Sequence, residues 1–246
     1  MKILFSPSES KNETSNFSPI DENSFIFPEL FKKRLEVIKH FNTYISFASQ
    51  QELINLFGIK KENEIIKLKQ NLLTLSTAQA IERYSGVSYE YLDYSTLNLE
   101  AKNYILQNVI IFSNLFGPIL AANLIPFYKF KQGAKIANFN IEQFYNTYFS
   151  TALDEFLKDE ELLDLRAGFY EKFYTPKRKF SSYKFIKNGK IVSHFAKAYR
   201  GILLKILAQN QIQNNKELLE CLPQTLKVKE VQIKGFKEEI ILEIIS

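Results

Sequence analysis

Short apolar runs along the chain predict the strands of a sheet. Val109–Ser113 is a continuous apolar run, typical of a strand covered on both faces, and Lys2–Phe5 is predicted to be a buried first strand. The turn Asn188-Gly189 is a strong signal for a type I′ hairpin. The other predicted strands are Leu124–Phe130, Leu162–Leu165, Tyr183–Ile186, Lys190–Phe195, Thr225–Ile233 and Glu238–Ile245, the last two joined near Gly235.

Apolar residues at helical spacing predict helices between these strands. Pro28 precedes the first helix, and Asn98 and Asn140 are suitable N-caps for two later ones. The predicted helices are Glu29–Phe41, Gln50–Phe57, a segment from Lys61 or Glu62 that carries Ile65 to Leu73, Thr77–Arg83, Leu99–Leu106, Ile141–Leu157 and Ala196–Gln209.

The order of these elements bears on the fold class. Because helices and strands do not alternate cleanly, the sequence favours an α+β fold with a mixed β-sheet flanked by helices over a doubly wound fold. With 246 residues and little Gly or Pro for linkers, we expect a single domain over residues 1–246, with a helical hairpin region at about 28–83 as a subdomain.

Composition excludes several classes of protein. No run of about 18 apolar residues exists, so no membrane span is expected, and the first apolar stretch is too short for a signal peptide. A cytoplasmic location is therefore predicted. The single Cys221 precludes an internal disulfide, and its apolar helical surroundings favour a small core residue. His40 and His194, the two histidines, are too few for imidazole-rich metal sites, so no metal or cofactor is expected.

Positive charge is concentrated in residues 166–205, which we call the basic tract. The tract holds eleven Lys or Arg and one acid, whereas the rest of the chain has 21 basic and 26 acidic residues. Such self-repulsion favours a protein that binds a polyanion, and a solvated basic surface without a ligand is the plainer alternative. The candidate DNA-binding residues are Lys172, Lys177, Arg178, Lys179, Lys184, Lys190, Lys197, Arg200 and Lys205. Phe180, Tyr183 and Phe185 alternate along a strand, which favours core packing over base stacking.

A second candidate for DNA contact lies between two predicted helices. The hairpin at Gly58, with Lys60 and Lys61 behind it, has the pattern of a helix-hairpin-helix that presents backbone N–H groups to a phosphate. It lacks the second glycine expected where Lys60 stands, so an αα-corner with Gly58 as its C′ cap is the simpler interpretation. An acidic segment from Asp154 to Asp164 is expected to be a solvated loop rather than a metal site.

Five segments together resemble the YaaA family of peroxide-stress proteins, in order and in spacing, over nearly the whole chain. The segments are Lys2-Ile3-Leu4-Phe5-Ser6-Pro7, Tyr84-Ser85-Gly86-Val87-Ser88-Tyr89, Ser113-Asn114-Leu115-Phe116-Gly117, Tyr128-Lys129 with Gly133, and Phe195-Ala196-Lys197-Ala198-Tyr199-Arg200-Gly201. The positions that match the family pattern are Ser6, Pro7, Gly86, Tyr89, Ser113, Gly117, Tyr128, Lys129, Gly133, Lys197, Arg200 and Gly201.

The resemblance implies a YaaA-type fold with a positively charged cleft and a helix-hairpin-helix element. It also implies a cytosolic protein that binds double-stranded DNA and limits oxidative damage by peroxide and iron, with no particular catalytic activity. The chain departs from the pattern at several positions. Leu120, Ala121 and Asn123 stand where the family has an Arg-Pro pair and an acid, Phe169 replaces a glutamate, and Glu9 replaces a lysine, with Lys11 close by.

Three functions are compatible with these patterns. The first is a monomeric protein that binds duplex DNA through its phosphates, with no membrane and no small-molecule substrate. The second is an enzyme acting on a nucleotide or phosphorylated metabolite in a basic cleft, with Ser6, Ser8, Lys197 and Arg200 converging on phosphate groups. The third is a scaffold for an acidic protein partner.

Overall fold

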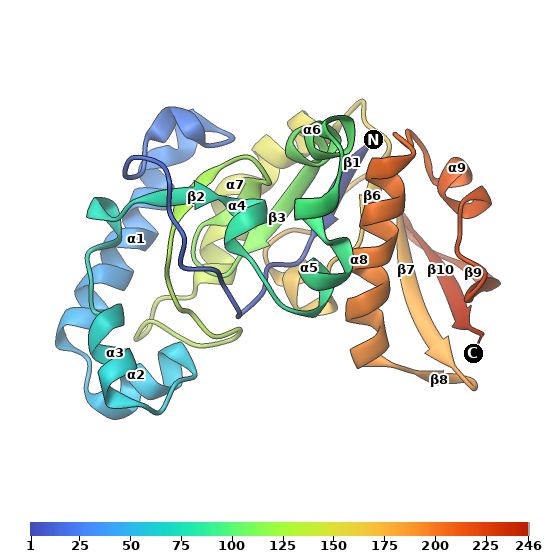
Figure 1. Ribbon diagram of the computed structural model, residues 1–246. Helices are drawn as coiled ribbons and strands as arrows, with labels where there is room; N and C mark the ends of the chain where they lie inside the picture. Colours follow the sequence, from blue (N-terminus) through green and yellow to red (C-terminus); the bar gives the residue numbers. More distant parts are fainter. Residues whose placement is uncertain (246) are drawn as a thin grey trace.

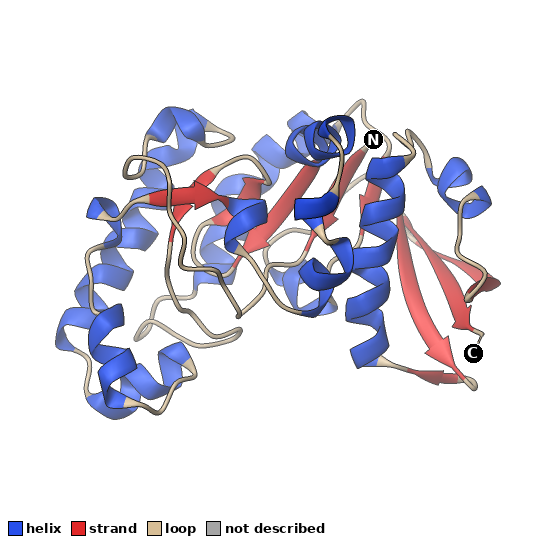
Figure 2. Cartoon of the chain, viewed as in Figure 1, coloured by secondary structure: helices blue, strands red, loops and turns tan. Residues whose placement is uncertain are grey.

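A mixed sheet forms the centre of the molecule (Figures 1 and 2). The computed structural model describes residues 1–245, apart from the side chain of His194, and within them eight strands form the sheet. Their order is β4-β3-β1-β6-β7-β10-β9, and β8 pairs with β7. The strands are β1 (Lys2–Phe5), β3 (Val109–Ser113), β4 (Gly117–Leu120), β6 (Leu162–Asp164), β7 (Phe180–Lys187), β8 (Lys190–Ile191), β9 (Leu226–Lys234) and β10 (Lys237–Ile244).

The inner strands of this sheet run parallel. Ile3 of β1 lies beside Val109 of β3 on one side and beside Leu163 of β6 on the other, and β6, β7 and β10 continue in the same direction. The edge strands β4 and β9 are antiparallel to their neighbours. The mixed α+β architecture predicted from the sequence is thus confirmed. The carboxyl ends of β1, β3 and β6 consequently meet at one edge of the sheet, which we call the carboxyl edge.

Helices cover both faces of the sheet. In Figure 1, α5, α6 and α8 lie on one face and α7 on the other. The α-helices are α1 (Phe31–Phe47), α2 (Gln50–Phe57), α3 (Glu62–Leu68), α4 (Ala80–Arg83), α5 (Val87–Leu92), α6 (Leu99–Asn108), α7 (Ile141–Leu157), α8 (Ser193–Gln209) and α9 (Asn215–Glu220). The 3-10 helices are η1 (Glu22–Ser24), η2 (Pro28–Leu30), η3 (Leu72–Thr74), η4 (Tyr94–Thr96) and η5 (Gly168–Lys172).

The core lies where the two helical layers meet the sheet. Leu4 and Phe5 of β1 and Ile110 to Phe112 of β3 are fully buried, which agrees with a strand covered on both faces. Phe180, Tyr183 and Phe185 of β7 are also buried, as predicted.

Buried Arg83 fixes the position of the chain just before the matching segment that begins at Tyr84. Strand β2 (Thr77–Gln79) pairs with β5 (Leu124–Pro126) in a two-stranded sheet, and α4 follows β2 directly. Arg83, the last residue of α4, is fully buried. Its guanidinium donates to the carbonyls of Asn12, Thr14 and Ile125. These contacts satisfy a buried cation with carbonyl oxygens, and they fix the loop that follows β1 against the small sheet.

Local caps set several predicted boundaries. The side chains of Asn98 and Asn140 accept hydrogen bonds at the starts of α6 and α7. Asn188 and Gly189 both have positive φ, at 51° and 74°, as a type I′ turn requires. These predictions from short polar signals are confirmed.

Other predicted boundaries are wrong where tertiary pairing dominates. The predicted helix at Thr77–Arg83 is a strand followed by one helical turn, because Thr77 exchanges backbone hydrogen bonds with Phe17 on one side and pairs with Pro126 on the other. The predicted strand after Leu124 stops at Pro126, which has no N–H to extend the ladder.

Three further corrections concern helices. The third predicted helix ends at Leu68, because Asn71 caps a separate turn that contains Leu73. Helix α8 begins at Ser193 rather than Ala196, so the predicted strand from Lys190 ends at Ile191. Cys221 is exposed rather than buried, because it caps the short helix α9 beyond that helix's buried residues.

Candidate functional site

Segments that are far apart in the sequence meet at the carboxyl edge. Ser6 follows β1, Ser113 ends β3 and Arg166 follows β6. In open sheets with parallel strands, ligands commonly bind at this edge, because loops from neighbouring strands diverge there. The edge therefore defines the candidate site.

A chain of three hydroxyl groups lies at this edge. Tyr128 Oη lies 2.8 Å from Ser113 Oγ and 2.8 Å from Tyr84 Oη, and all three residues are buried. Ser113 Oγ also accepts hydrogen bonds from the backbone N–H groups of Leu115 and Phe116, at 3.2 and 2.9 Å. Both acceptor positions of Ser113 are thereby used, so Ser113 donates its proton to Tyr128, while in the Tyr84–Tyr128 pair either hydroxyl can be the donor. One of the two tyrosine hydroxyls therefore keeps a proton that is available to a further acceptor.

Burial keeps these tyrosines protonated. Desolvation raises the pKa of Tyr84 well above its ordinary value, and it raises the pKa of Tyr128 as well. Nearby Tyr89 and Tyr170 show the same upward pKa shift, again chiefly from burial. The edge thus presents neutral hydroxyl donors rather than phenolates.

The loop after β1 is fixed against this chain of hydroxyls. Tyr89 donates a hydrogen bond to the carbonyl of Ser6 at 2.9 Å, and Ser6 Oγ accepts one from the N–H of Ala167 at 2.8 Å. Gly86, with φ of 97°, passes so close to Ser8 that a Cβ there would lie 2.8 Å from Ser8 Oγ. The residues Ser6, Gly86 and Tyr89 therefore position the loop, and Pro7 lies within it.

Lys11 brings an amine from this loop over the tyrosine rings. Its Nζ lies 4.3 Å from the ring centre of Tyr128 and 5.2 Å from that of Tyr84, and it donates to the carbonyl of Ser8 at 2.9 Å. The residue keeps partial exposure, but its amine is densely surrounded. Burial, with a smaller contribution from the charge of Lys129, lowers the pKa of Lys11 to about 7.

The charges around this amine are unbalanced. Lys129 and Arg83 both act to lower the pKa of Lys11, whereas Glu9 opposes them. Lys129 Nζ donates to the backbone carbonyl of Glu9 at 3.4 Å, while the Glu9 carboxylate accepts from the N–H of Gln132. Among the described residues, neither lysine has a carboxylate within 4.0 Å.

The basic tract does not form one surface. Arg166 is buried in an ion pair with Asp164 at 2.7 Å, so it serves the fold. Arg200 is half-buried and faces the interior. Desolvation lowers its pKa, and the negative charge of Asp164 offsets only part of that lowering. Arg178 donates to the carbonyl of Leu157.

Carboxylates from elsewhere neutralise other members of the tract. Lys177 lies 3.9 Å from Asp154, and Lys205 lies 3.2 Å from Asp93. The pKa of Glu239 is lowered chiefly by its hydrogen bond with Lys234, and the charge of Lys184 in β7 adds to this lowering. The acidic segment and the basic tract thus partly compensate each other.

Exposed lysines of the tract lie at opposite ends of β7. Lys179 immediately precedes the strand, whereas Lys190 is in β8 at the far hairpin and Lys197 is in the second turn of α8. Lys172 stands apart in η5, with its Nζ 4.9 Å from the ring centre of Phe169. Strand β7 therefore separates cations that are close in sequence.

The α2–α3 corner has the predicted helices and turn. Gly58 has φ of 70° and donates its N–H to the carbonyl of Ile54 at 2.9 Å, so it caps α2. Lys60 and Lys61 are exposed, and Lys61 is paired with a glutamate of its own helix. The chain at Lys131 packs beside Gly58. A DNA-binding helix-hairpin-helix is not shown by this geometry and stays a prediction.

Gly201 matches the family pattern for a structural reason. A Cβ there would lie 2.0 Å from the carbonyl oxygen of Ser88, so α5 and α8 cross at contact distance. Ser88 also donates its hydroxyl to the carbonyl of Lys197 at 2.8 Å. The other matching glycines are Gly117, which begins β4, and Gly133 in the loop before α7.

Asn123 explains one departure from the family pattern. Its Oδ1 accepts hydrogen bonds from the N–H groups of Leu120 and Ile26, at 2.8 and 3.3 Å, and its Nδ2 donates to the carbonyl of Ser24. The amide holds the turn after β4 to the loop before α1, and Ala121 packs in the core. At this position the chain has a structural amide instead of the family's acid.

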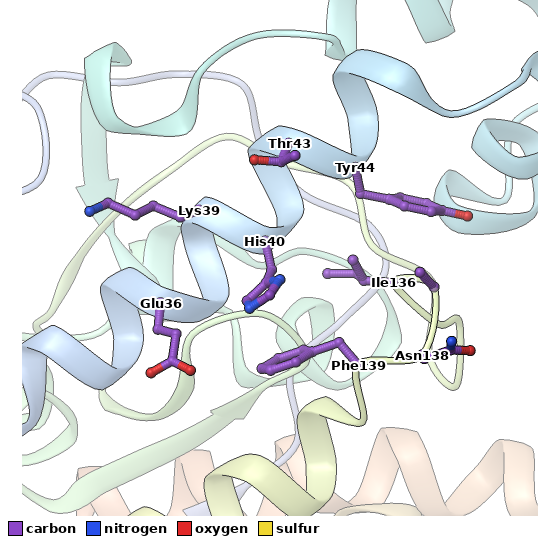
Figure 3. Close-up of a pocket in the computed structure, with 9 residues that line it drawn as sticks. Glu36, Lys39, His40, Thr43, Tyr44, Ile136, Asn138 and Phe139 are labelled. Carbon is purple, nitrogen blue, oxygen red and sulfur yellow. The ribbon is translucent and has the colours of Figure 1, made fainter.

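The molecule has several cavities, and one of them is lined by tyrosines of the carboxyl edge. The groove in Figure 3 lies between α1 and residues 136–139 and has a volume of about 710 Å³. In this groove the rings of His40 and Phe139 stack, with their centres 4.4 Å apart. A second cavity of about 890 Å³ includes Gly133 and Phe169. A third, of about 760 Å³, is walled by Tyr84, Tyr89 and four carboxylates. Among the described residues, no group of three or more His, Cys, Asp or Glu is placed to hold a metal ion.

These features define an α+β protein with a buried Tyr-Ser cluster, and a partly buried lysine beside it, at the carboxyl edge of a mostly parallel sheet. The family model described as peroxide stress protein YaaA matches residues 1–232, so the chain belongs to that family. An uncharacterized protein of Campylobacter jejuni is 64% identical over 246 residues and 100% of each chain. A UPF0246 protein of Corynebacterium glutamicum is 32% identical, over 86% of this chain and 86% of its own. A UPF0246 protein of Fusobacterium nucleatum is 30% identical, over 89% of this chain and 90% of its own.

Sequence reasoning identified Ser6, Tyr89, Ser113 and Tyr128 through the resemblance, and the structure brings them together. It did not identify Tyr84 as the end of a hydroxyl chain, although Tyr84 begins one of the matching segments. A hydroxyl chain has no spacing signature, because its members come from three segments that are far apart in the sequence.

Proposed function

We propose that the protein acts in the peroxide-stress response by binding duplex DNA through backbone phosphates, and that it thereby limits iron-dependent oxidative damage. The family to which the chain belongs supports the stress role. Binding through phosphates is sequence-tolerant, so physical shielding of DNA is the simplest protective mechanism. A cytoplasmic location and a monomeric state are parts of this proposal.

Exposed lysines along one side of the molecule carry the proposal. Lys190 and Lys197 lie at the carboxyl end of β7, and Lys60 and Lys131 lie at the α2–α3 corner. None of the four has a carboxylate within 4.0 Å among the described residues. In Figure 1, β8 and the α2–α3 corner both lie along the lower side of the molecule. A duplex that contacted both groups would release counterions from its phosphates.

The test is a titration of a short duplex at two salt concentrations. Four phosphate contacts predict a loss of affinity of roughly 100-fold between about 50 and about 200 mM salt. The double variant Lys190→Glu/Lys197→Glu should weaken binding and lower the salt slope by about 2. Binding that is absent or insensitive to salt would refute the proposal.

A matched pair of substitutions controls for net charge. Lys177→Glu/Lys179→Glu makes the same charge change at the amino end of β7. We expect this pair to weaken binding much less than the Lys190/Lys197 pair. Equal weakening by both pairs would mean that net charge, rather than this surface, governs association.

A further inference from the structure

We propose that Lys11, Lys129 and a hydroxyl of the Tyr84–Tyr128 pair form a binding site for one small oxyanion, distinct from the proposed DNA surface. The site belongs to the carboxyl edge, and its two lysines are partly buried, unlike the exposed lysines of the proposed DNA surface. Its ligand would be an anion of the size of sulfate, phosphate or a carboxylate.

The first argument is the position of the two amines. Lys11 Nζ and Lys129 Nζ contact the same carbonyl oxygen of Glu9, at 3.5 and 3.4 Å. They consequently lie within about 7 Å of each other and repel, and a neutral carbonyl compensates neither charge. An anion placed between the two amines would satisfy both.

The second argument is the missing counter-charge. Arg83 adds a third cation to the group, while Glu9 is the carboxylate that acts on Lys11. The Glu9 carboxylate is bound instead to the N–H of Gln132 at 3.1 Å. Cations with a buried amine are normally paired, so Lys11, in a group with excess positive charge, is a candidate for a functional site.

The third argument is the direction of the hydroxyl chain. Because Ser113 accepts two backbone N–H groups, it donates its own proton into the chain, and one hydroxyl of the Tyr84–Tyr128 pair keeps a proton free to donate. Lys11 Nζ lies over the same tyrosine ring. A tyrosine hydroxyl together with ammonium groups is a donor set that oxyanions prefer.

Within the part of the chain that the structure describes, few charged and polar groups face Lys11. They are Glu9 and Ser8 from its own loop, Arg83 and Tyr84 at the end of α4, and Tyr128 and Lys129 after β5. The tyrosines stay protonated, so Lys11 is the group that changes charge near neutrality. Anion binding should therefore favour protonation of Lys11.

Sulfate is the right first probe, because it does not itself titrate near neutral pH. Isothermal titration of the whole protein with sulfate should show affinity about tenfold higher at pH 6 than at pH 8, following the protonated fraction of Lys11. At pH 7, titrations in two buffers of different ionisation enthalpy should show uptake of roughly half a proton per anion. Absent binding, or equal affinity at both pH values, would overturn the proposal.

Variants assign the effect to Lys11. Lys11→Met should abolish sulfate binding, whereas Lys11→Arg, which stays charged, should bind equally at both pH values. Tyr84→Phe should weaken binding about tenfold. Lys179→Met, an exposed control, should leave it unchanged. Wild-type affinity in Lys11→Met, or an unaltered pH dependence in Lys11→Arg, would contradict the assignment.

Two further titrations separate the sources of the anion. Inorganic phosphate should compete with sulfate for the site. If the site instead served a DNA phosphate, sulfate would displace duplex DNA, and Lys11→Met would weaken duplex binding more than Lys179→Met does. That result would overturn the distinction between the two sites, and it would leave the Lys190/Lys197 prediction to be judged by its own test.

Discussion

Replacing Lys11 by methionine should stabilise the protein at low pH. The amine is enclosed by two tyrosine rings, and burial lowers its pKa from 10.5 to about 7. Below pH 7 the amine is protonated in both the folded and the unfolded chain, so the full penalty of enclosing the charge applies there. Between pH 7 and pH 10.5 the unfolded chain holds the proton and the folded chain does not. Stability from this group therefore rises with pH through that window.

The magnitude follows from the same pKa. A change from 10.5 to about 7 corresponds to an upper bound of about 5 kcal/mol. Lys11 keeps partial contact with water, which weakens the penalty, so we expect about 2 kcal/mol at pH 6. By pH 9 about half of this difference should disappear. Methionine fills a similar volume without a charge, so Lys11→Met should be more stable than wild type by about 2 kcal/mol at pH 6 and by about 1 kcal/mol at pH 9.

Urea unfolding of both proteins at pH 6 and pH 9 measures this difference. Other titrating groups are shared by the two proteins, so their effects cancel in the comparison. Lys179→Met, at an exposed position, should match wild type at both pH values. A stability gap that is constant with pH, or that widens as pH rises, would refute the reasoning.

Two further predictions concern buried contacts, one between two helices and one between two charges. Gly201→Ala should destabilise the protein by about 3 kcal/mol or more in urea unfolding, because a Cβ would lie 2.0 Å from the carbonyl oxygen of Ser88 and α5 and α8 would have to separate; a loss below about 1 kcal/mol would contradict this contact. Arg166→Met should lower the free energy of unfolding by about 3 to 5 kcal/mol, because it leaves the buried carboxylate of Asp164 unpaired. The double variant Arg166→Met/Asp164→Leu should recover part of that loss, and no recovery would argue against the ion pair as its cause.

The sequence predicted the elements whose signals are local. Asn98, Asn140 and Asn188-Gly189 each act through bonds or angles within a few residues, and each prediction is confirmed. The strand at Thr77 was missed, because its hydrogen bonds come from segments about 60 and 49 residues away in the chain. Pairing between distant segments leaves no periodic pattern in a stretch of three residues.

Charge density along the chain was a poor guide to charge density in space. The basic tract spans a buried ion pair at Arg166, an extended strand and the length of a helix. An extended strand advances about 3.3 Å per residue, so Lys179 and Lys190 are separated by the full length of β7. Clustering in sequence predicts clustering in space only when the intervening chain turns back, and β7 turns back only at its end.

The cluster around Lys11 shows the opposite case, in which a motif is altered but its charge is kept. The family pattern has a lysine where this chain has Glu9, and by position alone the cation is lost. In the structure the amine of Lys11 reaches back to the carbonyls of Ser8 and Glu9, while the Glu9 carboxylate turns to the N–H of Gln132. A long side chain on an irregular loop can thus supply a charge from two residues away. For this reason, substitution of Lys11 should reveal the chemistry of the edge more directly than substitution at the position of the motif.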